Sequence, residues 1–323
     1  MIRVESLRAG YRAGFRRAWR EVLKGVSFHV PKGSITGYLG VNGAGKTTTI
    51  KVLVGINSAA EGKVEIGGYP AGSVRAQLTL GYFPEAPFFY DSLNGLEVLD
   101  FYGRLSGLDR ATRKQRSGEL LEEVGLSDGT LPVRGYSKGM RQRLGLAQAL
   151  IHHPEVLLLD EPLDGLDPMG RLHLRELIAR QREAGRTVFF SSHVLSDVEA
   201  VSDHLVVLDG GKIAYDGATE EIASSSGMES LVHLRFELKG ELGSVLQAHD
   251  PKALGGDRYQ TTLPDQASAD LALKAIVEAE GRVLELHTRQ PTLEETFLAR
   301  FGQEGARTGP DLPTPAPAPA EAK

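Results

Sequence analysis

Residues 35–55 read ITGYLGVNGAGKTTTIKVLVG, and they are the most informative segment of the chain about its fold. An apolar run leads into a glycine-rich turn and then into an amphipathic segment, which predicts a strand, a loop and a helix in succession. The turn matches G-x-x-x-x-G-K-[ST] at every position. Glycines allow backbone N–H groups to converge on phosphate oxygens, and the start of the helix adds its positive end. The stretch therefore predicts a binding site for ATP or GTP.

Nine consecutive residues make up the predicted phosphate site. Lys46 is placed to reach the β- and γ-phosphates, and the Thr47 hydroxyl is placed to ligate Mg²⁺. The full set is Gly40, Val41, Asn42, Gly43, Ala44, Gly45, Lys46, Thr47 and Thr48.

A second stretch, VLLLDEP at residues 156–162, is an apolar run that ends in two acids. The run predicts a buried strand, and α/β proteins bind ligands at the carboxyl ends of such strands. Asp160 is suited to hold Mg²⁺ through its water shell. Glu161 is suited to act as the general base that polarises an attacking water. The alternative is an acidic strand end without a role, and the presence of a phosphate loop counts against it.

Residues 1–225 alternate short apolar runs with amphipathic segments. This alternation predicts an α/β domain with a largely parallel core sheet. The predicted strands cover residues 34–39, 78–83, 156–159, 187–191 and 204–208, with shorter antiparallel additions at 64–67 and 212–216. The predicted helices cover residues 46–54, 97–105, 112–124, 138–152, 169–181 and 195–201.

The composition changes at residues 224–227, SSSG, which predicts a linker. A small α+β domain is expected over residues 228–302, and residues 308–323 are rich in Pro and Ala, which predicts a disordered tail. The strands expected in the small domain cover 231–238, 259–263 and 283–288, and its helices cover 269–280 and 293–301.

The bulk composition excludes several classes of protein. The net charge is −5, so no global positive field attracts nucleic acid or anionic membrane, although Arg16, Arg17 and Arg20 form a local basic cluster. Cysteine is absent, which excludes disulfides and thiolate chemistry. No run approaches the roughly 20 apolar residues of a membrane-spanning helix, and the charged N-terminus does not resemble a signal peptide. We therefore expect a cytoplasmic protein that serves a membrane only as a peripheral partner.

The segment YSKGMRQRL at residues 136–144 resembles the signature motif of ABC ATPases, in a variant common among exporter subunits. By this resemblance, Ser137 and Gly139 contact the γ-phosphate bound by the other subunit of a dimer. A serine and glycines at the start of a helix also favour anion binding on physical grounds. Residues 163–168, LDGLDP, resemble the family's D-loop, which contacts the opposite subunit.

Three further residues take roles from the same resemblance. His193 follows an apolar strand as the family's switch histidine does, where it would hydrogen-bond the γ-phosphate. Tyr11 matches the aromatic residue that stacks on adenine, but an insertion lengthens its spacing to the loop and leaves Phe15 or Trp19 as alternatives. Glu85 stands where the family most often has Gln. It can still ligate Mg²⁺ but adds negative charge, so we expect an altered Mg²⁺ dependence.

The resemblance implies a P-loop NTPase core of the ABC ATPase type, with an antiparallel β subdomain and a helical subdomain, followed by the small C-terminal domain. It implies an ATP-hydrolysing subunit that uses ATP and Mg²⁺, with Lys46, Glu161 and His193 in the catalytic step. The implied partners are a second nucleotide-binding subunit, identical or related, and a separate multi-spanning membrane permease. The permease would bind in a groove near Glu85 and residues 86–126. Export is favoured over import, the implied location is the cytoplasmic face of the cell membrane, and no nucleic acid is expected.

Two alternatives compete with this interpretation. An ABC ATPase that acts on ribosomes or DNA would carry two cassettes or a long coiled coil, and residues 46–137 contain no sustained heptads. An inactive ATPase used as a scaffold is disfavoured by the intact Lys46, Thr47, Asp160, Glu161 and His193. The resemblance covers residues 1 to about 225, and the C-terminal domain shares only the weak motif PTLEETFLARF with accessory domains of some bacterial exporter subunits.

Overall fold

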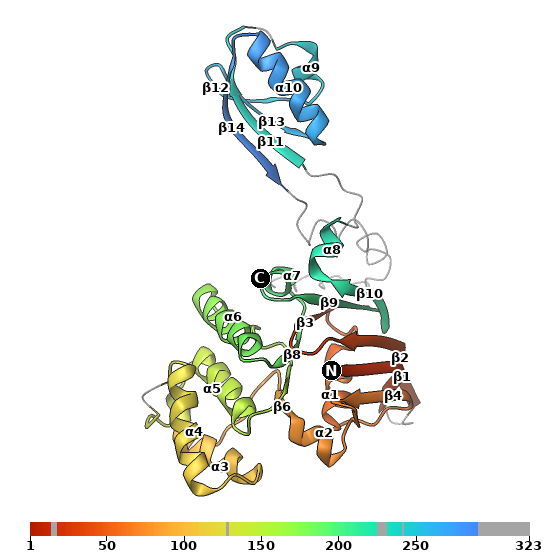
Figure 1. Ribbon diagram of the computed structural model, residues 1–323, viewed down its shortest axis with the longest axis vertical. Helices are drawn as coiled ribbons and strands as arrows, with labels where there is room; N and C mark the ends of the chain where they lie inside the picture. Colours follow the sequence, from red (N-terminus) through yellow and green to blue (C-terminus); the bar gives the residue numbers. More distant parts are fainter. Residues whose placement is uncertain (14–17, 127–128, 225–230, 241, 290–323) are drawn as a thin grey trace, which may run out of the picture. The chain divides into compact units, whose positions relative to one another are not determined.

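The computed structural model describes residues 1–13, 18–126, 129–224, 231–240 and 242–289. Its contacts divide the chain into two units, Met1–Glu220 and Glu221–Lys323. The first unit contains two sheets flanked by helices, and the second contains a small antiparallel sheet with its own helices (Figure 1). None of the described helices is long and apolar enough to cross a membrane.

The larger sheet of the first unit has the strand order β10-β9-β3-β8-β7-β6. All residues of β3, β7 and β8 are buried, as expected for parallel strands covered on both faces. Because these three strands are parallel neighbours, their carboxyl ends meet at one edge of the sheet. The parallel strands are β3 (Ile35–Leu39), β6 (Leu80–Phe83), β7 (Val156–Leu159), β8 (Thr187–Ser192) and β9 (His204–Asp209), and the antiparallel one is β10 (Lys212–Ala218).

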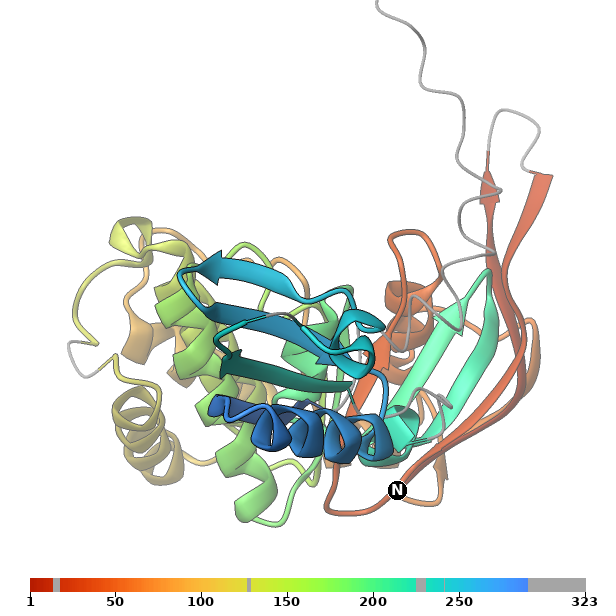
Figure 2. The ribbon, with the colours of Figure 1, turned by 90° about the horizontal axis from the view of Figure 1, so that it is seen from above.

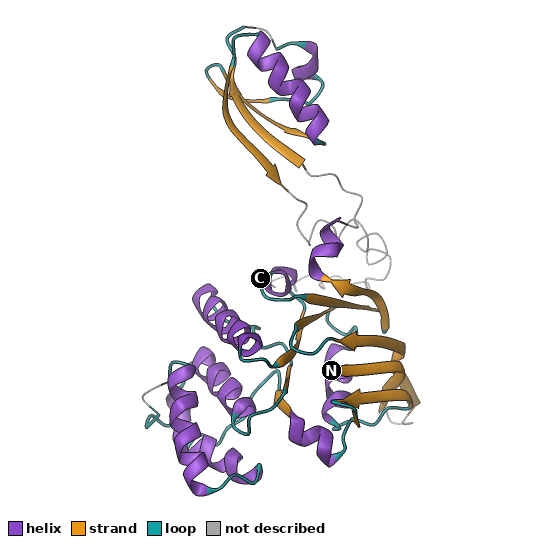
Figure 3. Cartoon of the chain, viewed as in Figure 1, coloured by secondary structure: helices purple, strands orange, loops and turns teal. Residues whose placement is uncertain are grey.

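Helices α3, α4 and α5 pack on one another and form a helical group away from the antiparallel strands (Figures 1 and 3). Local sequence sets where they begin: Asn94 and Glu97 form a reciprocal capping box at α3, and Asp109 and Ser137 cap α4 and α5. The helices of the first unit are α1 (Lys46–Val54), α2 (Val74–Thr79), α3 (Gly95–Leu105), α4 (Arg110–Glu123), the 3₁₀ turn η1 (Val133–Gly135), α5 (Lys138–Leu150), α6 (Pro168–Glu183), α7 (Leu195–Glu199) and α8 (Thr219–Ser224), which runs past the unit boundary.

The second sheet of this unit is antiparallel, with the order β2-β1-β4-β5. Its strands are β1 (Ile2–Ala13), β2 (Ala18–Val30), β4 (Glu61–Ile66) and β5 (Tyr69–Pro70). The pairing of β1 with β4 ends at Arg8, whereas the pairing of β1 with β2 continues to Ala13 and Ala18. The outer part of this hairpin, residues 9–13 and 18–22, therefore projects from the sheet (Figure 2), and we call it the arm.

The second unit is built on the antiparallel sheet β12-β13-β11-β14. Ala269, Ala272 and Ile276 of α10 pack on the apolar face of β11, in a cluster with Val232 and Phe236. Its elements are β11 (Leu231–Glu237), α9 (Ser244–Gln247), β12 (Lys252–Gly255), β13 (Arg258–Leu263), α10 (Gln266–Glu278) and β14 (Arg282–Arg289).

The structure confirms the predicted α/β fold with a largely parallel core sheet and corrects one strand. The predicted strand at 78–83 begins only at Leu80, because Ser73 caps a helix that includes residues 78 and 79. The long hairpin of β1 and β2 was not predicted. The predicted helix at 293–301 and the tail at 308–323 lie outside the described residues, so the domain boundaries there stay predictions.

Candidate active site

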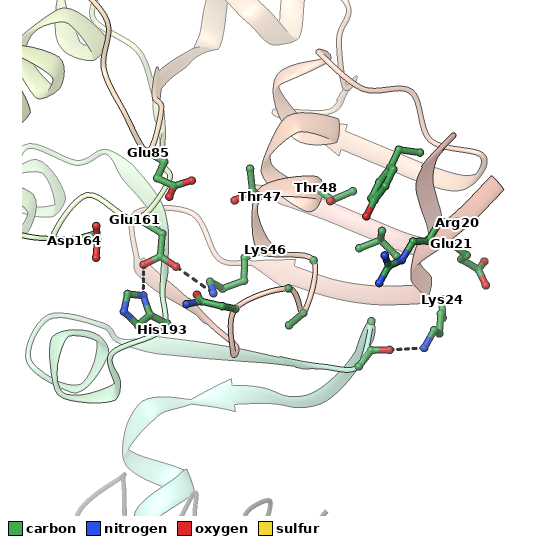
Figure 4. Close-up of a pocket in the computed structure, with 18 residues that line it drawn as sticks. Arg20, Glu21, Lys24, Lys46, Thr47, Thr48, Glu85, Glu161, Asp164 and His193 are labelled. Atoms are coloured by element: carbon green, nitrogen blue, oxygen red, sulfur yellow. Dashed lines mark hydrogen bonds and ion pairs between the residues drawn. The ribbon is translucent and has the colours of Figure 1, made fainter. Parts of the chain in front are cut away.

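A cavity of about 690 Å³ lies between the phosphate loop, the carboxyl ends of β7 and β8, and the base of the arm. Figure 4 shows Glu85, Glu161 and His193 on one side of this cavity near Lys46, and Arg20 and Lys24 on the other side. Most of the predicted site residues line it: Tyr11, Asn42, Gly43, Ala44, Gly45, Lys46, Thr47, Thr48, Glu85, Glu161 and His193.

The phosphate loop depends on glycine at two points. Gly43 and Gly45 have φ angles of 85° and 117°, in the left-handed region that favours glycine. A Cβ atom on Gly45 would lie only 2.7 Å from Leu23 Cδ2. α1 begins at the next residue, so its unpaired N–H groups open toward the cavity, as phosphate binding at a helix start requires.

Lys46, Glu161 and His193 form a linked set of polar side chains, although Lys46 begins α1 and the other two follow different strands, β7 and β8. The buried Lys46 Nζ donates to the Gly40 carbonyl at 2.6 Å and lies 3.1 Å from Glu161 Oε1. The other carboxylate oxygen, Glu161 Oε2, lies 2.9 Å from His193 Nδ1. The backbone of Glu161 has a φ of 46°, a strained conformation for a residue other than glycine. Its N–H donates to Ser191 Oγ at 2.9 Å, which helps hold that conformation.

Asp160 is buried directly beneath this set. Its Oδ1 accepts hydrogen bonds from Ser191 Oγ at 2.7 Å and from Thr47 Oγ1 at 3.3 Å. Burial raises the pKa of Asp160, and the negative charges of Glu85 and Glu161 raise it further. Burial, together with the charges of Asp160 and Glu85, also raises the pKa of Tyr82 to about 12. A cation bound here would relieve this concentration of negative charge.

The residues around Asp160 fit a magnesium ion. Asp160 Oδ2 is buried and has no hydrogen-bond partner in the structure, and the Thr47 hydroxyl lies beside the same carboxylate. Oxygen donors of this kind suit a small, hard cation. The described part of the chain holds no group of three or more His, Cys, Asp or Glu residues that could bind a metal. A magnesium ion would therefore take its remaining ligands from phosphate and water, as it commonly does.

The far end of the cavity is formed by the arm. Tyr11 lines the cavity with 48% of its surface exposed, and it pairs across the hairpin with Arg20. Trp19, one of the alternatives for stacking on adenine, pairs with Arg12 and does not line the cavity. Phe15, the other alternative, lies outside the described residues.

Five of the predicted site residues do not line this cavity, and one of them is Asp160, which is buried beneath it. Gly40 and Val41 lie at the start of the loop, where Gly40 receives the Lys46 hydrogen bond and Val41 points its side chain to solvent. Ser137 is exposed and caps α5, since its Oγ accepts from Met140 N at 3.2 Å, and Gly139 follows in the first turn. Neither Ser137 nor Gly139 lines the cavity of its own chain, and their role in the site of a second subunit stays a prediction.

Several cavity or supporting residues were not predicted. Ser191, which holds both Asp160 and the backbone of Glu161, is a polar residue in an otherwise apolar strand, and that signal could have found it. Arg20 also lines the cavity, whereas the sequence indicates only that it belongs to a basic cluster. A contact between β2 and the β9–β10 turn brings three more residues to the cavity, Lys24, Gly210 and Gly211. No local sequence pattern predicts this contact.

Three comparisons place these features among known proteins. A family model described as ABC transporter matches residues 23–164. An ABC transporter ATP-binding protein of Synechocystis sp. is 36% identical over 92% of this chain and 84% of its own length. The linearmycin resistance ATP-binding protein LnrL of Bacillus subtilis is 33% identical over 94% of this chain and 99% of its own length. Among solved structures, an ATP-binding subunit of an ABC transporter is 31% identical, covers 70% of this chain and 93% of that chain, and superposes with a TM-score of 0.62.

Proposed function

Because the chain belongs to the ATP-binding proteins of ABC transporters and is an ATP hydrolase of that family, we propose that the cavity hydrolyses ATP in the presence of Mg²⁺ to drive export through a separate membrane permease. The observation that carries this proposal is the linked set Lys46–Glu161–His193 at the mouth of the phosphate loop. In this set Glu161, the base for water, lies within hydrogen-bonding distance of Lys46, the cation for phosphate, and of His193, which orients the carboxylate.

In the proposed reaction a water molecule attacks the γ-phosphorus and the bond from that phosphorus to the bridging oxygen of ADP breaks. Glu161 accepts the proton of the attacking water, and the His193 ring holds the carboxylate in place. Lys46 and the N–H groups of the loop stabilise the charge on the β- and γ-phosphates. Lys46 Nζ lies 3.1 Å from Glu161 Oε1 in this structure. Phosphate oxygens must therefore replace the carboxylate as the partner of Lys46 before Glu161 can accept a proton from water.

Thr47 and Asp160 are the residues that would hold Mg²⁺, with Glu85 on the cavity wall beside them. When bound, the ion neutralises charge on the phosphates and positions them. Asp160 contributes an orphaned carboxylate oxygen, and Thr47 a hydroxyl at the first turn of α1. These assignments predict that Asp160 and Thr47 variants lose Mg²⁺-dependent turnover before they lose nucleotide binding.

The active form in this proposal is a dimer of nucleotide-binding subunits. Ser137 and Gly139 lie at the exposed start of α5, and Lys138 beside them contacts Asp164 of the D-loop at 3.5 Å. In a second subunit the same helix start would face the γ-phosphate of this chain. A serine hydroxyl and free N–H groups at a helix start suit that role.

The permease is proposed to dock on an aromatic patch made of Phe88, Tyr90 and Phe101, which follows Glu85 in the chain. Phe88 is 80% exposed, and the Tyr90 ring lies 6.4 Å from Phe88 and 6.2 Å from Phe101, centroid to centroid. Exposed aromatic residues gathered in this way are typical of protein interfaces. The occupant we propose is a short cytoplasmic helix of the permease, which would place the chain at the cytoplasmic face of the membrane. The relative LnrL is named for linearmycin resistance, which supports export of a small molecule as the direction of transport.

The first experiment is a pull-down of the chain from native membranes, with Glu161→Gln used to trap the ATP-bound dimer. We expect a multi-spanning membrane protein to be recovered. Recovery of ribosomes or DNA with no membrane partner would contradict the transport proposal while leaving the ATPase chemistry intact.

A second pull-down tests the aromatic patch. Phe88→Ala combined with Tyr90→Ala should abolish recovery of the permease and leave ATP hydrolysis by the isolated chain unchanged. Leu78→Ala combined with Val74→Ala, which removes exposed apolar residues of α2, is the matched control and should recover the permease normally. Equal recovery with both pairs of substitutions would show that the patch is not the docking surface.

A further inference from the structure

The arm adds a cationic side chain to the cavity that neither the phosphate loop nor the acidic strand end explains. Arg20, Val22 and Lys24 are alternate residues of β2, and all three line the cavity. They form one wall that runs from the phosphate loop, where Gly45 packs against Val22, to Tyr11 on the arm. The two cations of this wall are in different states.

Lys24 is already engaged. Its Nζ donates to the Gly210 carbonyl at 2.7 Å, and its backbone N–H donates to the Gly211 carbonyl at 2.8 Å. These two bonds tie the base of the arm to the β9–β10 turn. Lys24 therefore helps to position the wall, and its ammonium group is already hydrogen-bonded to a backbone carbonyl.

Arg20 has no such partner: among the residues that the structure describes, none accepts a hydrogen bond or forms an ion pair with its guanidinium. The nearest carboxylate in sequence, Glu21, pairs instead with Arg8 at 2.8 Å. Figure 4 shows the Arg20 head pointing into the cavity and the Glu21 carboxylate pointing away from it. A guanidinium that lines a cavity without a protein partner is free to bind a ligand.

The position of Arg20 in the hairpin indicates which part of the nucleotide it meets. It is the direct cross-strand partner of Tyr11, and side chains in such pairs lie about 5 Å apart at their Cβ atoms. The acids that serve the phosphates and the metal, Glu85 and Glu161, lie at the other end of the cavity (Figure 4). On the basis of the proposed nucleotide site, we infer that Arg20 binds the base and ribose end of ATP, alongside Tyr11.

This contact has a distinctive energetic signature. The base and ribose are the same in ATP and ADP, so an Arg20 contact strengthens the binding of both nucleotides by the same factor. It makes no contact with the reacting phosphate, so its loss raises KM for ATP rather than lowering kcat. The effect is moderate because the guanidinium is exposed to water.

The test is calorimetric binding of ADP and ATP, each with Mg²⁺, to the full chain. Arg20→Gln should raise Kd for both nucleotides roughly five- to tenfold, the size expected for one ordinary hydrogen bond that is partly exposed to water. Arg20→Lys keeps the charge but not the planar guanidinium, so its Kd for each nucleotide should lie between those of wild type and Arg20→Gln. Arg12→Gln is the matched control, because Arg12 is an exposed arginine on the same hairpin that does not line the cavity.

Two results would overturn the inference. One is an Arg20→Gln chain that binds both nucleotides within about twofold of wild type, or no more weakly than Arg12→Gln. The other is a loss confined to ATP with ADP unaffected, which would place the contact at the γ-phosphate. Failure of the proposed function is distinguishable from both, because then wild type itself would bind no nucleotide, or Lys46→Ala would bind as well as wild type.

Discussion

The two ends of the cavity are built in opposite ways. At the phosphate end, Lys46, Asp160 and Glu161 are buried at the carboxyl edge of a parallel sheet. Lys46 forms an ion pair with Glu161, and Ser191 donates a hydrogen bond to Asp160. At the arm end, Tyr11 and Arg20 stand exposed on a two-stranded hairpin. Chemistry requires atoms held in place with little freedom, whereas recognition of a flat base requires only a surface to stack on. Substitutions should therefore affect turnover at the first end and affinity at the second.

The largest effect is expected for Glu161→Gln. Removing the base should lower kcat for ATP hydrolysis by about 10³-fold, within the range for loss of a general base, while ATP still binds. Steady-state phosphate release together with nucleotide binding measures both. Glu155→Gln, an exposed glutamate at the amino end of the same strand, is the control and should hydrolyse ATP normally. Near-normal turnover by Glu161→Gln would assign the base to another residue.

Asp160→Asn should make the fold more stable at neutral pH and the enzyme less active. Because the pKa of Asp160 is raised in the folded chain, the stability that this group contributes is present below the unfolded pKa of about 3.9 and is lost as pH rises through the folded pKa. The fold is therefore less stable at neutral pH than in acid because of this buried carboxyl, whereas asparagine does not ionise and its Oδ1 still accepts from Ser191.

The variant should melt about 2–4 °C higher than wild type at pH 7 without nucleotide, and this gain should shrink toward pH 4. Its Mg²⁺-dependent hydrolysis should fall by about 10²-fold. Thermal melts across pH, alongside Asp209→Asn at the exposed end of β9, measure the first effect. A lower melting temperature at pH 7 would show that the carboxylate stabilises the fold.

At the arm end, Tyr11→Ala should weaken ATP binding by about tenfold, as expected for loss of one aromatic stacking partner, with little change in kcat. Tyr11→Phe should retain most of the affinity because the ring remains. Trp19→Ala distinguishes the alternatives, since Trp19 does not line the cavity and its loss should leave Kd unchanged. If Trp19→Ala weakened binding and Tyr11→Ala did not, adenine would stack on the tryptophan.

The smallest effect is expected for Glu85→Gln, because Glu85 lies on the cavity wall beside the proposed magnesium ligand Asp160. Removing one negative charge should raise the Mg²⁺ concentration for half-maximal hydrolysis by about threefold, an effect typical of a single partly solvated charge. Hydrolysis measured across a Mg²⁺ titration checks this, and identical curves for the variant and wild type would contradict it.

The phosphate end could be predicted residue by residue because its parts are short motifs. Gly45, Lys46 and Thr47 follow one another in a single turn, and Asp160 and Glu161 end a single apolar strand, so local spacing reports the chemistry. The arm could not be predicted in this way. Its strands carry charges on both faces and lack the regular alternation that marks a strand with one buried face, and the contact between Tyr11 and the cavity depends on the register of β1 with β2.

Local sequence patterns were enough to predict the fold class, the phosphate loop, the two acids and the family, because each depends on residues close together in the chain. The three-dimensional structure was needed to show that Glu161 lies between Lys46 and His193, that Ser191 supports Asp160, and that Arg20 lines the cavity. These relations join residues up to 147 positions apart, from Lys46 to His193, through the pairing of β3, β8 and β7. No local pattern encodes them, because which strand lies beside which is decided by how the whole core packs.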